Sequence, residues 1–444
     1  MRINLFIAFA VSSFMCTKTF IASASLTNQK PYWLFIFPLI FLLSAIFYKK
    51  VSFLKNTIAK IFLALFTAIP YLAFLFFIAI SLIHPAQKDF QAKLTPVFAS
   101  VQEIDSGKQL NTLLDGLIQK IDADEKTLVS DFDTTDLKNE KITAILSKTK
   151  DDRIKIFQYI NSNSIAIPNN FSAEELTSSA QEAADNEISL STMITVFKIE
   201  LLEIRKLRFE GKNQEAADKY IKSWYKAKEV LALKNTKLVD SLCHVAIVKL
   251  LGEYYYDNQD FFINYDLTEV ANLKDAIFDN LDESFESAFT NEYATSKMAC
   301  DKAKDAWPLY DTNLVQRKLD GLYYFMIQSL KNPCDDSLTY EEPIDSSNFN
   351  FIMHPYNFIG EVLYSINVSM YSGIIANILK VKNSLSVYFY GMDKNNYKDI
   401  PINFATGEKL IVKDFPDRIE IEAAYSTNTE TPPQKFEIIK SLGH

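Results

Sequence analysis

The sequence predicts a mainly α-helical protein: N-terminal transmembrane helices, then a hairpin- or solenoid-like helical domain, then a small antiparallel β element at the C-terminus. Three observations predict this fold class. Long uncharged apolar runs fill much of the first 85 residues, apolar residues then recur three or four positions apart, and glycine accounts for only 10 of 444 residues. We expect a membrane module at 1–85, a membrane-proximal helical region at 86–190, a helical hairpin domain at 191–390 and a β-rich segment at 391–444.

The clearest candidate for a transmembrane helix is the run IFLALFTAIPYLAFLFFIAISLI at 61–83, which contains no charged residue. At about 1.5 Å of rise per residue, a helix of this length crosses a hydrocarbon core of about 30 Å. Two further apolar runs precede it, at 3–24 and 32–48. The first contains Lys18, which is costly in lipid, and ends in the small residues Ala-Ser-Ala, as signal-peptide cleavage sites do. We therefore expect about three transmembrane helices, the first either retained or cleaved.

Charge orients this module. The first 85 residues contain seven basic residues and no acidic one. Four of these, Lys49, Lys50, Lys55 and Lys60, lie between the second and third apolar runs, so the positive-inside rule predicts a cytoplasmic loop there. The large C-terminal domain would then face the extracytoplasmic side of the membrane. The alternative for the module is a buried helical hairpin in a soluble core.

The region at 86–190 shows helical spacing at 110–121, 141–148 and 153–160. Between the first two stretches, Asp131 to Thr135 match the DxDxT pattern of aspartate-nucleophile phosphatases. That chemistry needs the first carboxylate at the tip of a buried parallel strand beside a metal. The preceding residues form a poor strand, so a solvated loop with a helix cap is the alternative.

The most regular stretch predicts three helices, within 191–211, 213–233 and 237–257, with a turn from Gly211 to Asn213 after the first. The junction RFEGKNQEAADKYIKSW is similar to the helix–turn–helix of tetratricopeptide repeats, although no 34-residue repeat follows. The third helix carries His244, which could serve catalysis or be a core histidine. It also carries Tyr254 and Tyr255, which could form a binding surface or pack in the core.

Further helices are expected up to residue 390. Glu283, Glu286 and Glu292 could do acid–base work or form a solvated helix face. A loop with His354, Pro355, Asn357 and Gly360 precedes a long apolar helix, and we take these four as candidate binding residues. Charged and polar residues interrupt that helix, so it is expected to be core and not a fourth span; they are Lys380, Lys382 and Asn383.

Cysteine and motif content give no sign of a metal or cofactor. None of the four cysteines has metal-ligand spacing. Cys300 and Cys334 could form a disulfide or remain two thiols, depending on the compartment. The sequence has no phosphate-binding glycine loop, HExxH motif or Ser/His/Asp order, so we name no catalytic residue, metal or cofactor. All 55 acidic residues lie after residue 85, which argues against a nucleic-acid partner.

Three short strands are expected after residue 407, at 408–415, 418–426 and 435–443. The segment from Phe404 to Leu410 forms a tight turn into the first of them. Gly407 should have a positive φ in this turn, because glycine is the residue that adopts it without strain.

Residues 190–426 resemble a family of uncharacterised bacterial membrane-anchored proteins with a helical, TPR-like ectodomain and a small C-terminal β segment. The matching motifs are a Pro-x-Asn-x-x-Gly loop before a long helix, a Gly-turn before a strand and a terminal Tyr-Ser. They correspond here to Pro355, Asn357, Gly360, Phe404, Thr406, Gly407, Leu410, Tyr425 and Ser426. The chain departs from the family at Lys409, where a proline is usual. The helix-plus-sheet end is also loosely similar to type IV pseudopilins. The resemblance implies a bacterial inner-membrane location and no particular activity.

These observations lead to two hypotheses of function. The first is a membrane-anchored extracytoplasmic scaffold that binds another envelope protein or a peptide, because stacked helical hairpins form extended surfaces. The alternative is an extracytoplasmic enzyme acting on lipid or cell-wall material, with His354, His244 or the helix carboxylates as its candidates.

Overall fold

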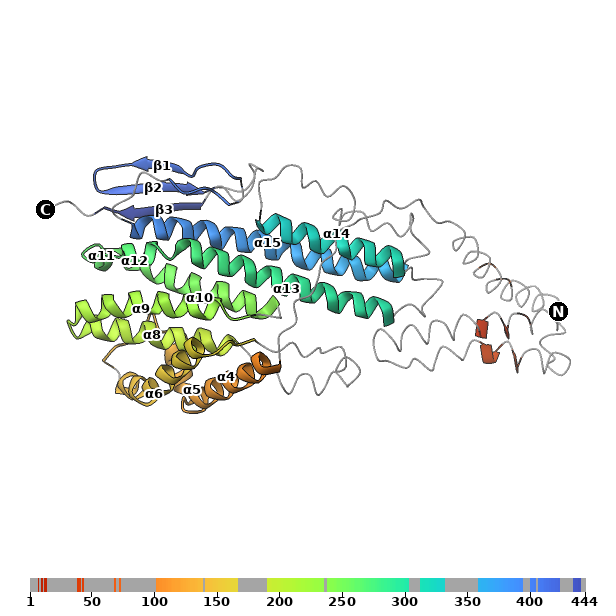
Figure 1. Ribbon diagram of the computed structural model, residues 1–444, viewed down its shortest axis with the longest axis horizontal. Coiled ribbons are helices and arrows are strands. Elements are labelled where there is room, and N and C mark those ends of the chain that lie inside the picture. Colours follow the sequence, from red (N-terminus) through yellow and green to blue (C-terminus); the bar gives the residue numbers. More distant parts are fainter. Residues whose placement is uncertain are drawn as a thin grey trace, which may run out of the picture. The chain divides into compact units, whose positions relative to one another are not determined.

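A computed structural model describes residues 101–138, 140–166, 190–234, 238–302, 312–331, 358–393, 400–404, 406–423 and 434–440, and single positions between 7 and 72. These residues form a mainly helical structure with a small antiparallel sheet at the C-terminal end (Figure 1). The coarse fold class predicted from the sequence is therefore confirmed. No helix within the described ranges is long and apolar enough to cross a membrane. The three expected spans lie almost wholly outside those ranges.

The first three described helices are α4 (Val101–Gln119), α5 (Ala123–Ser130) and α6 (Glu140–Ser162). Spacing of three and four residues buries one stripe of α4 completely, through Leu110, Leu114 and Leu117. A capping box starts α5: the Asp122 carboxylate accepts a hydrogen bond from the Glu125 N–H (2.8 Å), and the Glu125 carboxylate accepts one from the Asp122 N–H (2.9 Å).

A hairpin of α8 (Ser191–Phe209) and α9 (Asn213–Leu231) follows, and then α10 (Leu238–Asp257). Gly211 joins the hairpin with φ of 75°, in the left-handed region that favours glycine. The small residues Ala216 and Ala217 are buried, which lets α9 approach its neighbours closely. The Tyr220 hydroxyl donates a hydrogen bond to the Leu251 carbonyl of α10 (2.9 Å). These are the three helices that the apolar periodicity predicted.

The remaining helices are α11 (Gln259–Phe262), α12 (Thr268–Ala271), α13 (Lys274–Lys302), α14 (Thr312–Lys331) and α15 (Phe358–Met392). The last part of α15 packs closely on α10 at Gly252. A Cβ atom placed on this glycine would lie 2.5 Å from Cδ2 of Tyr388 and 3.2 Å from Cδ2 of Leu385. The two helices therefore approach where α10 has no side chain.

Polar residues inside the apolar α15 helix have partners in the core. Lys382 is 2% exposed and its Nζ lies 2.7 Å from Oδ1 of Asp282 in α13 and 4.7 Å from the ring centroid of Phe404. The Asn383 side chain donates to Asn403 (2.9 Å) and accepts from the Phe404 N–H (2.6 Å). These contacts attach the segment before the sheet to α15, consistent with a core helix.

The sheet contains β1 (Ile411–Asp414), β2 (Arg418–Ala423) and β3 (Gln434–Ile439), paired antiparallel in the order β1-β2-β3. Ile421 faces Val412 on one side and Phe436 on the other. Alternate residues are buried on one face, namely Ile419, Ile421, Ala423, Phe436 and Ile438. This period of two matches the strands expected from the sequence.

Side chains from the helical part hydrogen-bond to the backbone of β3. Gln259 donates to the Glu437 carbonyl (2.9 Å) and accepts from the Ile439 N–H (2.9 Å). The Tyr256 hydroxyl accepts from the Glu437 N–H (3.1 Å). The amide of Gln259 thus stands in for a neighbouring strand, which protects the edge of β3.

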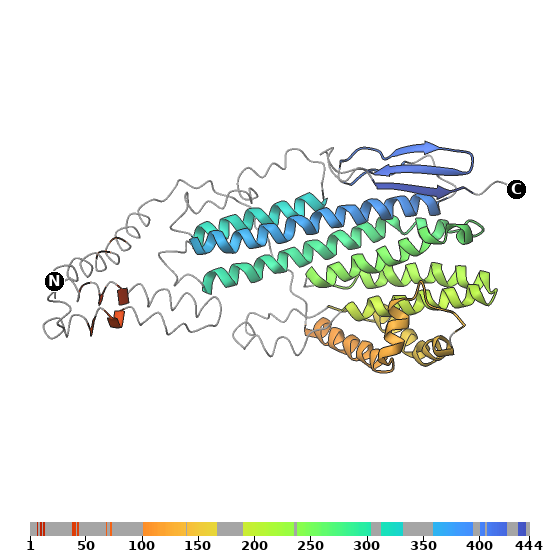
Figure 2. The same cartoon turned by 180° about the vertical axis from the view of Figure 1, so that it is seen from behind.

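The chain divides into two compact units, each made of separate segments. The first contains Met1–Leu94, Tyr293–Tyr324 and Tyr340–Tyr371; within it, the Tyr293 and Tyr323 rings meet edge-on at 5.8 Å between centroids. The second contains Thr95–Glu292, Phe325–Thr339 and Ser372–His444. In this second unit, α4 to α6 lie on one side of the α8–α9 hairpin and α10 lies on the other. Beyond α10 come the parts of α13 and α15 that belong to this unit, and then the sheet (Figures 1 and 2).

Candidate functional site: a cavity between α4, α5 and α8

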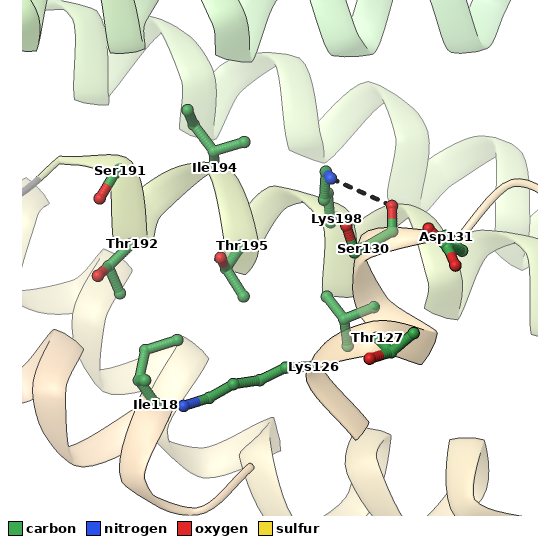
Figure 3. Close-up of a pocket in the computed structure, with 11 residues that line it drawn as sticks. Ile118, Lys126, Thr127, Ser130, Asp131, Ser191, Thr192, Ile194, Thr195 and Lys198 are labelled. Atoms are coloured by element: carbon green, nitrogen blue, oxygen red, sulfur yellow. Dashed lines mark hydrogen bonds between the residues drawn. The ribbon is translucent and has the colours of Figure 1, made fainter. Parts of the chain in front are cut away.

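An open cavity of about 590 Å³ lies between α4, α5 and α8 in the second unit (Figure 3). From α4 comes Ile118, near the helix end. The other lining residues are Lys126, Thr127, Val129, Ser130 and Asp131 at α5, and Ser191, Thr192, Ile194, Thr195 and Lys198 in α8. The volume falls within the range of about 300–1,000 Å³ that is usual for ligand sites.

The α8 side of the cavity is a polar stripe on a helix that is otherwise largely core. Met193, Val196, Phe197 and Ile199 are fully buried. By contrast, Ser191, Ile194, Thr195 and Lys198 recur at intervals of three and four residues, share one face, and keep part of their surface exposed. This partly exposed face of α8 is not fully covered by another helix, and it forms one wall of the cavity.

The opposite wall is made by the end of α4 and by the short helix α5, which are joined by a tight turn. α4 ends at Gln119 and α5 begins at Ala123, so Ile118 and the α5 residues approach α8 from different sides. Lys198 closes one end of the cavity, where its Nζ donates a hydrogen bond to the Ser130 carbonyl (3.1 Å; Figure 3). Thr195 and Ile118 face each other across the space in the same view.

The residues after α5 are held by the basic side chains of α8. The Lys206 ammonium donates to the Leu137 carbonyl (2.9 Å), and the Arg205 guanidinium donates to the Phe132 carbonyl. Asp131 is the C-cap residue of α5, and the Thr135 hydroxyl contacts the Asp131 carbonyl (2.7 Å). The DxDxT segment therefore forms a turn after a helix. A phosphatase nucleophile of this type needs to lie at the end of a strand, so the segment does not have the required arrangement.

A buried ionic cluster on the far side of α8 positions this wall. Glu200 is almost fully buried and pairs with Arg153 of α6, and its other oxygen lies 2.7 Å from Lys226 Nζ of α9. Burial alone would raise the pKa of Glu200, but the positive charges of Arg153, Lys226 and Lys219 lower it to about 2. Glu203 also joins the cluster, 2.7 Å from Arg153 and 3.0 Å from Lys219. These ion pairs fix α8 relative to α6 and α9.

The binding residues named from the sequence are not brought together here. His354, Pro355 and Asn357 lie outside the described residues, and Gly360 lies in the first turn of α15. Tyr254 and Tyr255 are each 5% exposed, because α10 is packed on several sides. Their rings contact Phe262 (6.1 and 5.9 Å between centroids), in an aromatic core that also contains Tyr220.

The other residues considered from the sequence have structural surroundings. His244 is fully buried, its Nδ1 lies 3.3 Å from the Ser284 hydroxyl, and burial lowers its pKa to about 3. Glu283 is exposed, Glu286 pairs with Lys331 (2.6 Å), and Glu292 is half-buried. No group of three His, Cys, Asp or Glu side chains in the described ranges could hold a metal ion.

Two cysteines, Cys243 and Cys300, lie within the described residues. Cys243 is a buried free thiol, and burial raises its pKa to about 11, so it is held as the thiol. Cys300 lies in α13, whereas Cys334 lies outside the described residues, so the Cys300–Cys334 disulfide stays a prediction.

The cavity residues were missed by reasoning from the sequence. The available signal was the spacing of Ser191, Thr195 and Lys198 among the apolar residues in the first half of this helix. That spacing is also what a solvated helix face produces, and only the packing of α4 and α5 over part of it creates a cavity. In comparisons with known proteins, no family model, curated protein or solved structure matches the chain.

Proposed function

We propose that this chain is a membrane-anchored scaffold of a bacterial envelope, whose helical extracytoplasmic part binds another envelope protein or a peptide. The observation that carries this proposal is the open cavity between α4, α5 and α8. Its walls combine aliphatic side chains with hydroxyl and ammonium groups that are still accessible. Mixed surfaces of this kind suit recognition of a polypeptide, which has both apolar side chains and backbone polar groups.

The membrane anchor is supported by the apolar, basic first 85 residues. Among the single described positions there, Leu39, Leu43 and Leu72 are helical and are 50%, 45% and 65% exposed. Large aliphatic side chains exposed on helices are what a lipid-facing surface requires. The cluster of lysines before the third apolar run supports an extracytoplasmic position for everything that follows it.

The surroundings of the buried ionisable groups favour a binding function over catalysis. Glu200 and Lys382 are each neutralised by partners on neighbouring helices, and His244 is enclosed in the core. These groups serve packing, and none of them lines the cavity. The resemblance to uncharacterised membrane-anchored proteins agrees with an anchored binding module of this kind.

Crosslinking in cells tests the proposal. The tagged full-length protein would be crosslinked in its native host and isolated, and its partners would be identified by mass spectrometry. We expect a defined envelope protein or peptide with the unaltered chain, and its loss with Thr195→Trp, which places a bulky ring in the cavity. Tyr225→Trp is the matched control, since Tyr225 is 41% exposed on α9 and does not line the cavity.

Two outcomes would contradict the proposal. Equal recovery of the partner with Thr195→Trp, in a variant whose circular dichroism and melting match the unaltered chain, would separate binding from the cavity. Recovery of the protein alone would argue against a scaffold and favour an enzyme or a small-ligand role.

A further inference from the structure

We infer that the α4–α5–α8 cavity recognises a peptide segment carrying a carboxylate next to an apolar side chain; this inference rests on the proposed binding function. It names the chemistry of the partner, which the proposed function leaves open.

The charge of the cavity favours an anionic group. Two ammonium groups line it, those of Lys126 and Lys198, against one carboxylate, that of Asp131. Within the described ranges, neither lysine forms an ion pair. By contrast, Lys219 and Lys226 both form ion pairs with Glu200, on the side of α8 that faces away from the cavity. Lys198 uses one N–H on the Ser130 carbonyl, so its remaining two N–H groups can donate to a bound carboxylate.

The uncharged groups favour a peptide over a simple anion. The hydroxyls of Thr192 and Thr195 can both donate and accept, as the alternating N–H and C=O groups of a peptide backbone require. The Thr127 hydroxyl donates to the Ala123 carbonyl (3.2 Å), so it can only accept from a ligand. Ile118 and Ile194 add aliphatic surface, which an apolar side chain would cover and a phosphate or free carboxylate would not. No aromatic residue is among the described residues that line the cavity, so these residues offer no platform on which a nucleobase could stack.

Size limits the bound segment. A cavity of about 590 Å³ that is open on one side accommodates a few residues of extended chain with their side chains. A whole amphipathic helix needs a groove several turns long, with anchors at three- and four-residue spacing. The occupant is therefore a short acidic–apolar segment of the partner.

The test uses the full-length chain and two libraries of N-acetylated, C-terminally amidated hexapeptides with random flanks. One library has Leu-Glu at its centre and the other has Leu-Gln, so the two differ only in the carboxylate. Retained peptides would be quantified by mass spectrometry after affinity capture. We expect the Leu-Glu library to be retained at least about tenfold better, because hydrogen bonds to a charged group are strong.

Variants locate the effect. Lys198→Met should weaken capture of Leu-Glu peptides about tenfold. Lys222→Met, which removes an exposed lysine of α9 outside the cavity, should leave capture unchanged. The comparison of the two libraries uses the unaltered protein, so it remains decisive if Lys198→Met fails to fold. Raising the salt concentration should reduce the preference for Leu-Glu peptides.

The outcomes separate this inference from the proposed function. Equal capture of both libraries overturns the carboxylate preference. No capture of either library, while the unaltered chain still recovers a partner in cells and Thr195→Trp does not, overturns the short-peptide inference and leaves the scaffold function standing. Displacement of Leu-Glu peptides by equimolar inorganic phosphate, at ionic strength matched with NaCl, overturns the peptide in favour of a general anion site.

Discussion

Glu200 shows how much the geometry of the cavity depends on a single buried charge. Its carboxylate lies among Arg153, Lys219 and Lys226, and these charges lower its pKa to about 2 although burial alone would raise it. Because the pKa is lower in the folded state than its ordinary value of 4.5, ionised Glu200 stabilises the fold above about pH 4.5. That contribution is lost as the pH falls towards 2.

We therefore predict that Glu200→Gln lowers the free energy of unfolding at pH 7 by about 3–5 kcal/mol, since it leaves buried positive charges without their main partner. The difference from the unaltered protein should shrink between pH 4.5 and pH 2. Urea unfolding at several pH values measures both effects. Glu210→Gln is the control: its carboxylate is far more exposed and pairs with Lys212 at the surface, so it should have little effect. Parallel pH curves for Glu200→Gln and the unaltered chain would contradict the assignment.

Gly407 provides a second prediction at this scale. Its φ of 71° lies in the left-handed region, as expected from the turn before the first strand. Gly407→Val should lower the free energy of unfolding by about 1–2 kcal/mol or more, because a β-branched residue is strained at positive φ. Gly407→Asn should cost less, since asparagine tolerates this conformation. Thermal unfolding checks the order, and an unchanged melting temperature in Gly407→Val would refute it.

Local residue roles were accessible from the sequence where backbone geometry alone decides them. Gly407 is an example, because the tight turn before the first strand predicts its positive φ. The turn predicted at Gly211 is likewise made by a glycine with positive φ. The surroundings of Tyr254 and Tyr255 were not accessible in this way, because the same tyrosines can line a surface or a core. Their burial depends on α10 being covered by α9, α11 and α15, and no local pattern specifies those contacts.

At the scale of the element, the contact between α10 and α15 leads to a testable substitution. Gly252→Ala would put a Cβ atom 2.5 Å from the Tyr388 ring, closer than real side chains approach. The ring lies in the core, so we expect a loss of stability of about 1–3 kcal/mol, as for other overpacked sites. Chemical denaturation of the purified full-length chain would measure it.

The control is another helical glycine. Gly116 in α4 has no atom within 4 Å of an added Cβ, so Gly116→Ala should be neutral or stabilise the fold by up to about 1 kcal/mol through helix propensity. If both substitutions had the same effect, steric contact at Gly252 would not be the cause. This contrast separates tertiary packing from the intrinsic preference of a helix for alanine.

Elements with a strong period were predictable, and their boundaries were close to those observed. α8, α9 and α10 follow the apolar spacing, and β2 and β3 follow the alternation of buried and exposed residues. The packing of α6 against α8 was not predictable from such a period. It depends on Arg153, which looks like a surface residue in the sequence but is buried against Glu200.

For the molecule as a whole, the sequence leads to a prediction about the topology of the proposed membrane module. An alkaline phosphatase fusion placed after Gln87 should be active, because the lysines at 49–60 favour a cytoplasmic loop and an extracytoplasmic continuation. A fusion at Lys55, within that loop, should be inactive. Activity at Lys55 and inactivity after Gln87 would reverse the orientation, and activity at neither site would argue against the anchor.

The candidate site could not be predicted from the residue types on α8 or from the pattern of any one helix. Hydroxyl and lysine residues on α8 are common on exposed helix faces, and α4 and α5 are unremarkable amphipathic or capped helices on their own. The cavity exists because two helices that diverge at a short turn cover only part of one face of a third. Such packing geometry depends on the whole second unit, including the ionic cluster that holds α8 from behind.

The most direct test of the central claim is a photocrosslink from the cavity itself. A benzoylphenylalanine residue at Thr127, an exposed position lining the cavity, would be irradiated in cells that make the full-length protein. The same group at Ile154, which is 45% exposed on α6 outside the cavity, provides the control. We predict one discrete crosslinked partner from Thr127 and none of the same mass from Ile154. No adduct from Thr127, or the same adduct from both positions, would contradict the assignment of the cavity as the binding site.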